Sequence, residues 1–258
     1  MSKALLPPFL MTSVPKSGTH LLHQILTGMP TVSMDIKNLQ KKFFMDNKYV
    51  VGQDKAFQDH FQRLKALPNN QFGLGHLWYT ANYKQFLKTL NMKHIFLHRD
   101  PRDVLVSMSY FIPSLWPEHP LHLPFQTVYT TPKARMMALI SGVKWPDFYH
   151  YNMPFYEWLI DSETLHISFE ELIKSEASRR SALVKIVNFL WADVSMPCSV
   201  EEMVNQMVAN IDNQTSGTFR KGAIGSWKHE FDEEVKAAFK ANAGDMLIRF
   251  GYENNNDW

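Results

Sequence analysis

The sequence predicts an α/β protein in which helices cover both faces of a central, mainly parallel sheet. Three short apolar runs, at 8–14, 93–98 and 164–168, have the length of buried parallel strands. Helix-like segments alternate with these runs, and this alternation favours a three-layer α/β/α arrangement. We expect helices at 19–28, 53–66, 81–90, 101–110, 154–161, 169–175, 178–191, 199–210 and 231–242.

Length and composition favour a single domain over residues 1–258. A chain of 258 residues with 45% hydrophobic content can bury a large core. The net charge of +2 is too small to favour a nucleic acid or a membrane surface as partner. The sequence has one cysteine, Cys198, and therefore no intrachain disulfide, which agrees with a reducing compartment.

The hydropathy pattern predicts a cytoplasmic protein. No run of about 18 apolar residues occurs, so we expect no transmembrane helix. Residues 1–10 lack the apolar segment and the cleavage site of a signal peptide.

The segment from Thr12 to His20 predicts an anion-binding turn between a strand and a helix. A helix N-terminus offers unpaired N–H groups and the positive end of the helix dipole, which suit a phosphate or sulfate. Pro15 fixes the entry to the turn, and Gly18 allows the backbone to approach the anion closely. The Walker pattern is excluded because Lys16 precedes the glycine.

Three segments resemble the sulfotransferases that use 3′-phosphoadenosine 5′-phosphosulfate. Pro15-Lys16-Ser17-Gly18-Thr19 resembles their 5′-phosphosulfate loop, Pro-Lys-Ser-Gly-Thr-Thr/Ser. Residues 94–111 resemble their 3′-phosphate segment, and residues 219–228 resemble their C-terminal signature Arg-Lys-Gly-x-x-Gly-Asp-Trp-Lys. Because the three segments occur in the family's order, the chain is identified as a member of this family, of the cytosolic or bacterial type. The turn is therefore expected to be a P-loop-like phosphosulfate-binding loop.

The resemblance implies which residues bind the co-substrate, 3′-phosphoadenosine 5′-phosphosulfate. It places one group at the 5′ end: Lys16, Ser17, Gly18, Thr19 and His20. It places a second group at the 3′-phosphate: Arg99, Ser107, Arg220, Lys221 and Gly222. Phe169 is expected either to contact the adenine or to belong to the core.

The chain departs from the family pattern at several of these positions. His20 stands where the family more often has Thr or Ser, and Leu21 where many members have a Trp that stacks on adenine. Ser226 replaces an Asp of the C-terminal signature. We expect Arg102 and Asp103 to be mainly structural, because an Asp early in a helix suits the helix dipole.

Sulfuryl transfer needs a cation at the leaving oxygen and a base for the acceptor. Charge builds on the bridging oxygen as the S–O bond opens, and we assign its stabilisation to Lys16. The resemblance places His76 as the general base, a task that an imidazole performs well near neutral pH. Leu74 replaces the Lys of the family's Lys-Thr-His motif, so the source of a second cation is left open. His119 and His122 are the alternative bases.

Residues 112–135, rich in proline and aromatic residues, are expected to form a long loop, either a lid that covers a small-molecule acceptor or a rigid surface connection. The acceptor's identity is open, and so is the oligomeric state. The sequence has no metal-binding motif, and no metal is expected. Two other functions are left open: a nucleotide kinase of the P-loop type, and a nucleotide-binding module without catalytic activity.

Overall fold

The structure of the chain, a computed structural model, describes residues 5–43, 55–212 and 222–258. These residues belong to two compact units. The sheet unit comprises Met1–His98 and Glu157–Gly217, and the helical unit comprises Arg99–Tyr156 and Thr218–Trp258. The single domain over residues 1–258 and the cytoplasmic location stay predictions.

The sheet unit contains a five-stranded sheet in which every neighbouring pair of strands is parallel. In spatial order the strands are β2 (Lys42–Phe43), β3 (Phe72–Gly75), β1 (Phe9–Ser13), β4 (His94–His98) and β5 (Leu165–Ser168). The predicted α/β fold with a parallel sheet is confirmed. The three predicted strands correspond to β1, β4 and β5, whereas β2 and β3 were not predicted.

Glycines explain why β3 is hard to predict from the sequence. A Cβ on Gly75 would lie 2.4 Å from the carbonyl oxygen of Phe43, and one on Gly73 would lie 2.8 Å from the Phe43 ring. The two glycines therefore let β2 approach β3 closely. Glycine is depleted in strands, so the same residues that permit this pairing hide the strand from a propensity argument.

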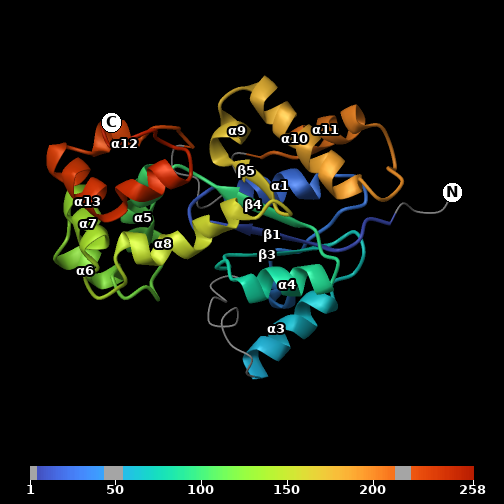
Figure 1. The fold of residues 1–258 in the computed structure, drawn as a ribbon, viewed down its shortest axis with the longest axis horizontal. Helices are drawn as coiled ribbons and strands as arrows, with labels where there is room; N and C mark the ends of the chain where they lie inside the picture. The colour runs from blue at the N-terminus through green and yellow to red at the C-terminus, as the bar shows by residue number, and fades with distance from the viewer. Residues whose placement is uncertain (1–4, 44–54, 213–221) are drawn as a thin grey trace. The chain divides into compact units, whose positions relative to one another are not determined.

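Helices cover both faces of the sheet within the sheet unit (Figure 1). One face carries α1 (Thr19–Thr27), α9 (Phe169–Ile173), α10 (Glu176–Trp191) and α11 (Val200–Ala209), and the other carries α3 (Lys55–Lys65) and α4 (Ala81–Thr89). Phe9 and Met11 of β1 pack into one apolar core with α1, α10 and α11, as the two-residue period of a strand requires. Short 3₁₀ helices lie at Leu39–Lys41 and Glu157–Ile160.

The described part of the helical unit consists of helices and their connections. They are α5 (Pro101–Leu115), α6 (His122–Thr127), α7 (Pro132–Ser141), α8 (Phe148–Tyr156), α12 (Trp227–Glu230) and α13 (Glu233–Arg249). α5 packs against α6, α7 and α12, and α13 packs against α7 and α8. Among the described residues of either unit, no helix is both long enough and apolar enough to cross a membrane.

The expectation of a long loop over residues 112–135 is wrong. The segment forms the end of α5, the short helix α6 and the start of α7. Its prolines mislead because Pro124 and Pro132 lie in the first turns of α6 and α7. There the missing N–H would have had no partner within the helix.

The helix expected at 154–161 is also misplaced. α8 covers Phe148–Tyr156, and the 3₁₀ helix Glu157–Ile160 follows it. Pro154 suggests the start of a helix but lies near the end of α8. The sequence pattern does not show where α8 ends, because apolar residues continue from α8 into the 3₁₀ helix.

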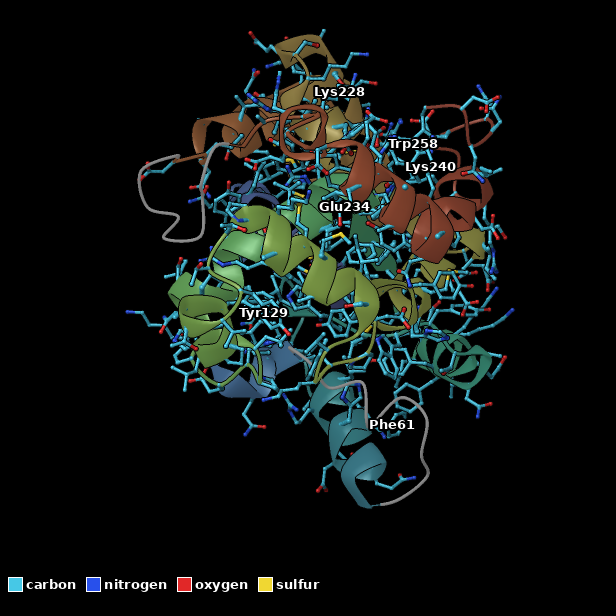
Figure 2. The ribbon with its side chains drawn as sticks, turned by 90° about the vertical axis from the view of Figure 1, so that its left-hand side faces the viewer. Phe61, Tyr129, Lys228, Glu234, Lys240 and Trp258 are labelled. Carbon is cyan, nitrogen blue, oxygen red and sulfur yellow. The ribbon has the colours of Figure 1, made fainter. Side chains whose placement is uncertain are left out.

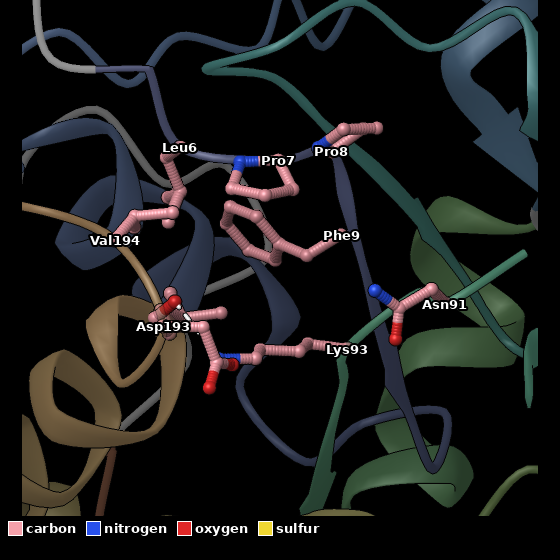
Figure 3. Close-up of a pocket in the computed structure, with 9 residues that line it drawn as sticks. Leu6, Pro7, Pro8, Phe9, Asn91, Lys93, Asp193 and Val194 are labelled. Carbon is pink, nitrogen blue, oxygen red and sulfur yellow. Dashed lines mark hydrogen bonds and ion pairs between the residues drawn. The ribbon is translucent and has the colours of Figure 1, made fainter.

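A small cavity lies at the amino end of β1 (Figure 3). Its volume is about 60 Å³, and its lining includes Phe9, Lys93 and Asp193. Lys93 Nζ donates to the carbonyl oxygens of Phe189 and Leu190 at 2.8 and 3.2 Å, and lies 2.7 Å from Asp193 Oδ2. Lys93 thus satisfies carbonyls in the last turn of α10. The cavity lies at the opposite end of β1 from the predicted phosphate loop.

The packing of α1 on α11 predicts a cost for a single added methyl group. Gly28 has an ordinary φ of −79°, but a Cβ there would lie 2.7 Å from Asn210 Cβ and 2.8 Å from Met207 Cα. Gly28→Ala should therefore lower the free energy of unfolding by about 1–3 kcal/mol through overpacking. Urea unfolding measures this, and an unchanged or higher stability would contradict the packing argument. Gly251→Ala is the control, with φ +76° and nothing within 4 Å, and should cost only backbone strain of about 1 kcal/mol.

Candidate active site

The predicted phosphate loop is a tight turn between β1 and α1 in the sheet unit. Ser17 donates twice to the carbonyl oxygen of Val14, from its N–H at 3.2 Å and from its hydroxyl at 2.6 Å. Lys16 and Gly18 have left-handed backbones, with φ of 74° and 95°. A left-handed lysine is strained, and such strain often marks functional turns. Both donors of Ser17 are used inside the turn, so its contact with the co-substrate stays a prediction.

Phe169 packs directly against the turn. It is 4% exposed and is the first residue of α9. A Cβ on Gly18 would lie 2.7 Å from Phe169 Cδ2, so the ring fills the space beside the glycine. Of the two roles expected for Phe169, the core role is the one for which the structure gives contacts. Its contact with adenine stays a prediction.

The first turn of α1 has no side-chain cap at its N-terminus. Gly18 is the N-cap residue and offers no side-chain acceptor to the first N–H groups of the helix. Thr19 is buried, and its hydroxyl lies 2.7 Å from the Ser13 hydroxyl. The N-terminus of α1 therefore has the donors and the dipole that favour an anion.

His76 lies beside this turn because β3 is parallel to β1. β3 ends at Gly75, which pairs with Thr12, so His76 follows at the same edge of the sheet as Ser13. His76 Nδ1 lies 2.8 Å from the Ser13 carbonyl oxygen. A carbonyl oxygen only accepts, so Nδ1 carries the hydrogen and the neutral ring has its lone pair on Nε2. The backbone of Leu77, which follows His76, is also held in place: the buried Trp158 donates from Nε1 to the Leu77 carbonyl oxygen at 2.9 Å.

Burial keeps His76 neutral. The pKa of His76 is lowered to about 4, mainly by burial; the hydrogen bond to Ser13 opposes this shift, and the nearby Lys16 and His20 add to it. At pH 7 the ring is therefore unprotonated, which is the state that a general base needs.

Positive charges gather near His20. Burial lowers the pKa of His20, and His23, Lys16 and Lys42 lower it in that order of effect. Lys42 belongs to β2 and was not predicted as part of the site. No sequence signal identified it, because β2 itself was not predicted.

In the helical unit, Arg99 is tied to the loop that precedes α12. Its Nη2 donates to the carbonyl oxygen of Ala223 at 2.9 Å and lies 3.6 Å from Asp103 Oδ2. Asp103 in turn accepts from the N–H groups of Gly225 and Trp227, at 2.8 and 3.0 Å. The start of α5 and this C-terminal loop are thus joined by a buried carboxylate.

Two other residues predicted at the 3′-phosphate, Ser107 and Gly222, lie on α5 and on the loop before α12. Ser107 is half-buried on α5, and Gly222 has a left-handed φ of 54°. Arg220 and Lys221 lie outside the described residues. The predicted residues thus fall into two groups: Lys16, Ser17, Gly18, Thr19, His20, His76 and Phe169 in the sheet unit, and Arg99, Ser107 and Gly222 in the helical unit.

Arg102 has the structural role that was expected. Its guanidinium donates to Asp100 from Nε at 3.0 Å and from Nη2 at 2.8 Å, and pairs with Glu253 at 2.6 Å. It also lies 3.9 Å from the ring centre of Trp227 and 4.6 Å from that of Trp258. Figure 2 shows Trp258 beside Lys240 of α13, whose Nζ is 4.8 Å from the ring centre. These contacts fix the C-terminal residues against the start of α5.

The alternative bases, His119 and His122, both make structural hydrogen bonds. His119 Nδ1 accepts from the N–H of Leu121 at 3.0 Å, which places its hydrogen on Nε2 and removes a lone pair there. His122 Nδ1 donates to the Ile112 carbonyl oxygen at 2.8 Å, and its Nε2 lies 3.2 Å from Gln126 Nε2. His122 thus has the same tautomer as His76, but its Nε2 faces the Gln126 amide.

Comparison with known proteins gives one consistent result. The sulfotransferase domain model matches residues 6–251. An amine sulfotransferase from Oryctolagus cuniculus is 26% identical over 213 residues, which are 74% of this chain and 67% of that protein. Sulfotransferase 6B1 from Mus musculus is 23% identical over 254 residues, 92% of this chain and 78% of that protein.

Solved structures share the fold. Mouse sulfotransferase SULT7A1 complexed with PAP aligns with a TM-score of 0.64 and 21% identity, over 93% of this chain and 84% of that one. A retinol dehydratase in complex with androsterone and inactive cofactor PAP aligns with a TM-score of 0.59 and 15% identity, over 93% and 80%. At these identities the likeness shows the fold.

The role of Asp103 predicts different effects for two substitutions. Asp103→Ala should lower the free energy of unfolding by about 2–4 kcal/mol, because it leaves the buried N–H of Trp227 and the partly buried N–H of Gly225 without an acceptor. Asp103→Asn keeps one acceptor oxygen and should cost less. Thermal unfolding of the two variants checks this order. Equal stability of Asp103→Ala and the wild type would contradict the role of Asp103 in holding the loop.

Proposed function

The chain belongs to the sulfotransferase domain family, and we propose that it moves the sulfuryl group of 3′-phosphoadenosine 5′-phosphosulfate to a hydroxyl or amine of a small acceptor. The observation that carries the proposal is the position of His76 beside the phosphate loop, with Nδ1 donating to Ser13. This arrangement directs a basic Nε2 away from the strand that holds the ring.

In the proposed reaction His76 is the general base. Nε2 takes the proton of the acceptor as the acceptor's oxygen or nitrogen forms its bond to sulfur. The bond between sulfur and the phosphate oxygen breaks, and its electron pair stays on that oxygen. The products are the sulfated acceptor and adenosine 3′,5′-bisphosphate, and the protonated ring later returns its proton to water.

Lys16 is proposed to stabilise the leaving phosphate oxygen. Its left-handed backbone places it inside the turn, and the N-terminus of α1 adds a dipole of the same sign. Preorganised positive groups at the position where charge develops give a large part of such rate enhancements. Lys42, which lies close enough to His20 to lower its pKa, is a candidate for the second cation that Leu74 cannot provide.

The nucleotide is proposed to bind through both groups of predicted residues. Gly18, Thr19 and His20 would hold the 5′-phosphate with backbone N–H and hydroxyl groups, and Phe169 would support the turn or contact the adenine. Arg99, Ser107, Arg220, Lys221 and Gly222 would hold the 3′-phosphate. A guanidinium presents parallel N–H donors that suit a phosphate.

The acceptor class is proposed from the chemistry of the base and from the relatives. An imidazole can assist the removal of a proton from a hydroxyl or an amine. Two of the matched proteins carry names or ligands of these types, an amine sulfotransferase and a retinol dehydratase complexed with androsterone.

Ligand-induced stabilisation tests the proposed nucleotide. Adenosine 3′,5′-bisphosphate at a hundredfold excess over its Kd should stabilise the protein by about 2.7 kcal/mol, because it binds the folded state alone. ATP with magnesium should give a much smaller shift. A thermal-shift assay with both nucleotides measures the difference. A larger shift with ATP and magnesium would contradict the proposal and favour a nucleotide kinase.

The proposed roles of His76 and Lys16 predict different defects. His76→Ala should lower kcat about 10²–10⁴-fold and leave the affinity for the bisphosphate largely intact. Lys16→Ala should lower both, because Lys16 contacts the phosphate before and during the reaction. Steady-state kinetics and calorimetry together check this. Near-normal turnover of His76→Ala would remove His76 from the mechanism.

The pH dependence follows from the same pKa. Protonation of His76 blocks the base, so kcat/KM should stay level as the pH falls through 6.5 and should decrease only toward a pH of about 4. Circular dichroism at each pH shows that the fold is intact. An acidic limb centred near 6.5 would contradict the assignment.

A further inference from the structure

Ser13 connects the proposed base to the phosphate loop by hydrogen bonds. Its hydroxyl lies 3.1 Å from His76 Nδ1 and 2.7 Å from the Thr19 hydroxyl. We propose that Ser13 is a positioning residue whose hydroxyl relays hydrogen bonding from His76 to Thr19, so that an anion bound in the loop strengthens the hydrogen bonds that orient the base. This inference rests on the proposed function.

When an anion is bound in the loop, the hydrogen bonds from His76 through Ser13 to Thr19 all donate toward the loop. His76 Nδ1 carries a hydrogen because it faces the Ser13 carbonyl oxygen at 2.8 Å. The Ser13 hydroxyl, at 3.1 Å, shares this hydrogen with the carbonyl as a second acceptor, and its own hydrogen is available for Thr19. Thr19 then accepts from Ser13, and its own hydrogen is available to the anion that is proposed to bind at the N-terminus of α1.

Burial makes the relay effective. Ser13 is fully buried and Thr19 is 7% exposed. Hydrogen bonds in such surroundings are stronger electrostatically, and successive hydroxyls polarise one another. When Nε2 takes the acceptor's proton, the positive ring donates more strongly from Nδ1, and the relay extends this polarisation toward the leaving phosphate.

The position of Ser13 is set by the sheet. It is the last residue of β1, pairs with Leu97 of β4, and follows Thr12, which pairs with Gly75 of β3. Its carbonyl and hydroxyl oxygens both contact His76 Nδ1. Only the hydroxyl also contacts Thr19 of the loop. Substitution by alanine removes this hydroxyl and keeps the carbonyl that holds His76.

The chain offers a matched control on the same strand. Thr12 is also fully buried, and its hydroxyl lies 2.7 Å from Nε2 of another histidine, His94. His94 Nδ1 lies 3.0 Å from the hydroxyl of Thr164, the residue before β5, so these hydrogen bonds lead away from the loop. Thr12→Val removes the same kind of hydrogen bond and leaves the relay intact.

Nuclear magnetic resonance of ¹⁵N-labelled histidine tests the relay at pH 7. The His76 signals are identified by their loss in His76→Asn, and adenosine 3′,5′-bisphosphate is the probe. In the wild type and in Thr12→Val, the bisphosphate should move the Nδ1–H proton signal downfield. In Ser13→Ala the movement should fall to less than half, while calorimetry shows bisphosphate affinity within about threefold of the wild type. Ser13→Thr keeps the hydroxyl and should keep the full response.

The relay and the proposed function are overturned by different results. If the bisphosphate binds and the signal moves equally in Ser13→Ala and in the wild type, the relay is overturned and the proposed function stands. If the bisphosphate does not bind the wild type, both are overturned. Should Ser13→Ala fail to fold, Thr19→Val interrupts the relay from the other end, and an undiminished response there overturns it.

Discussion

The parallel pairing of β3 with β1 is the constraint on which the proposed chemistry depends. Parallel strands end at the same edge of a sheet, so the residues that follow them meet. Here that edge carries the end of β1 with its phosphate turn and His76 after β3. A one-residue slip of β3 would reverse the side to which each of its side chains points and would remove His76 from Ser13.

Electrostatics give the turn and His76 different properties. The turn collects positive groups, the N-terminus of α1 and the side chain of Lys16, which suit a sulfate or phosphate. Burial, together with the charge of Lys16, holds the pKa of His76 low and keeps its ring neutral. In the proposed reaction, one environment therefore serves both the anion and an unprotonated base.

The sequence predicted the parts of the site that short motifs determine, and missed those that depend on packing. The loop was predicted because proline, lysine and glycine have local backbone reasons to occur in that order. β3 was missed because Gly73 and Gly75 are needed only for the approach of Phe43, which no local pattern reveals. The helices over residues 112–135 were missed because a proline in the first turn of a helix looks, in a sequence, like a proline in a loop. Lys42 has no motif, and its position near His20 follows only from the pairing of β2 with β3.

A crystal structure of the protein with adenosine 3′,5′-bisphosphate would show where the nucleotide binds. The 5′-phosphate should lie at the N-terminus of α1, within hydrogen-bond distance of the Thr19 hydroxyl and Lys16 Nζ, with His76 Nε2 facing the same space. The 3′-phosphate should lie at Arg99 and Ser107. A 5′-phosphate bound away from the turn, or a His76 ring turned so that Nε2 faces Ser13, would contradict the proposed site.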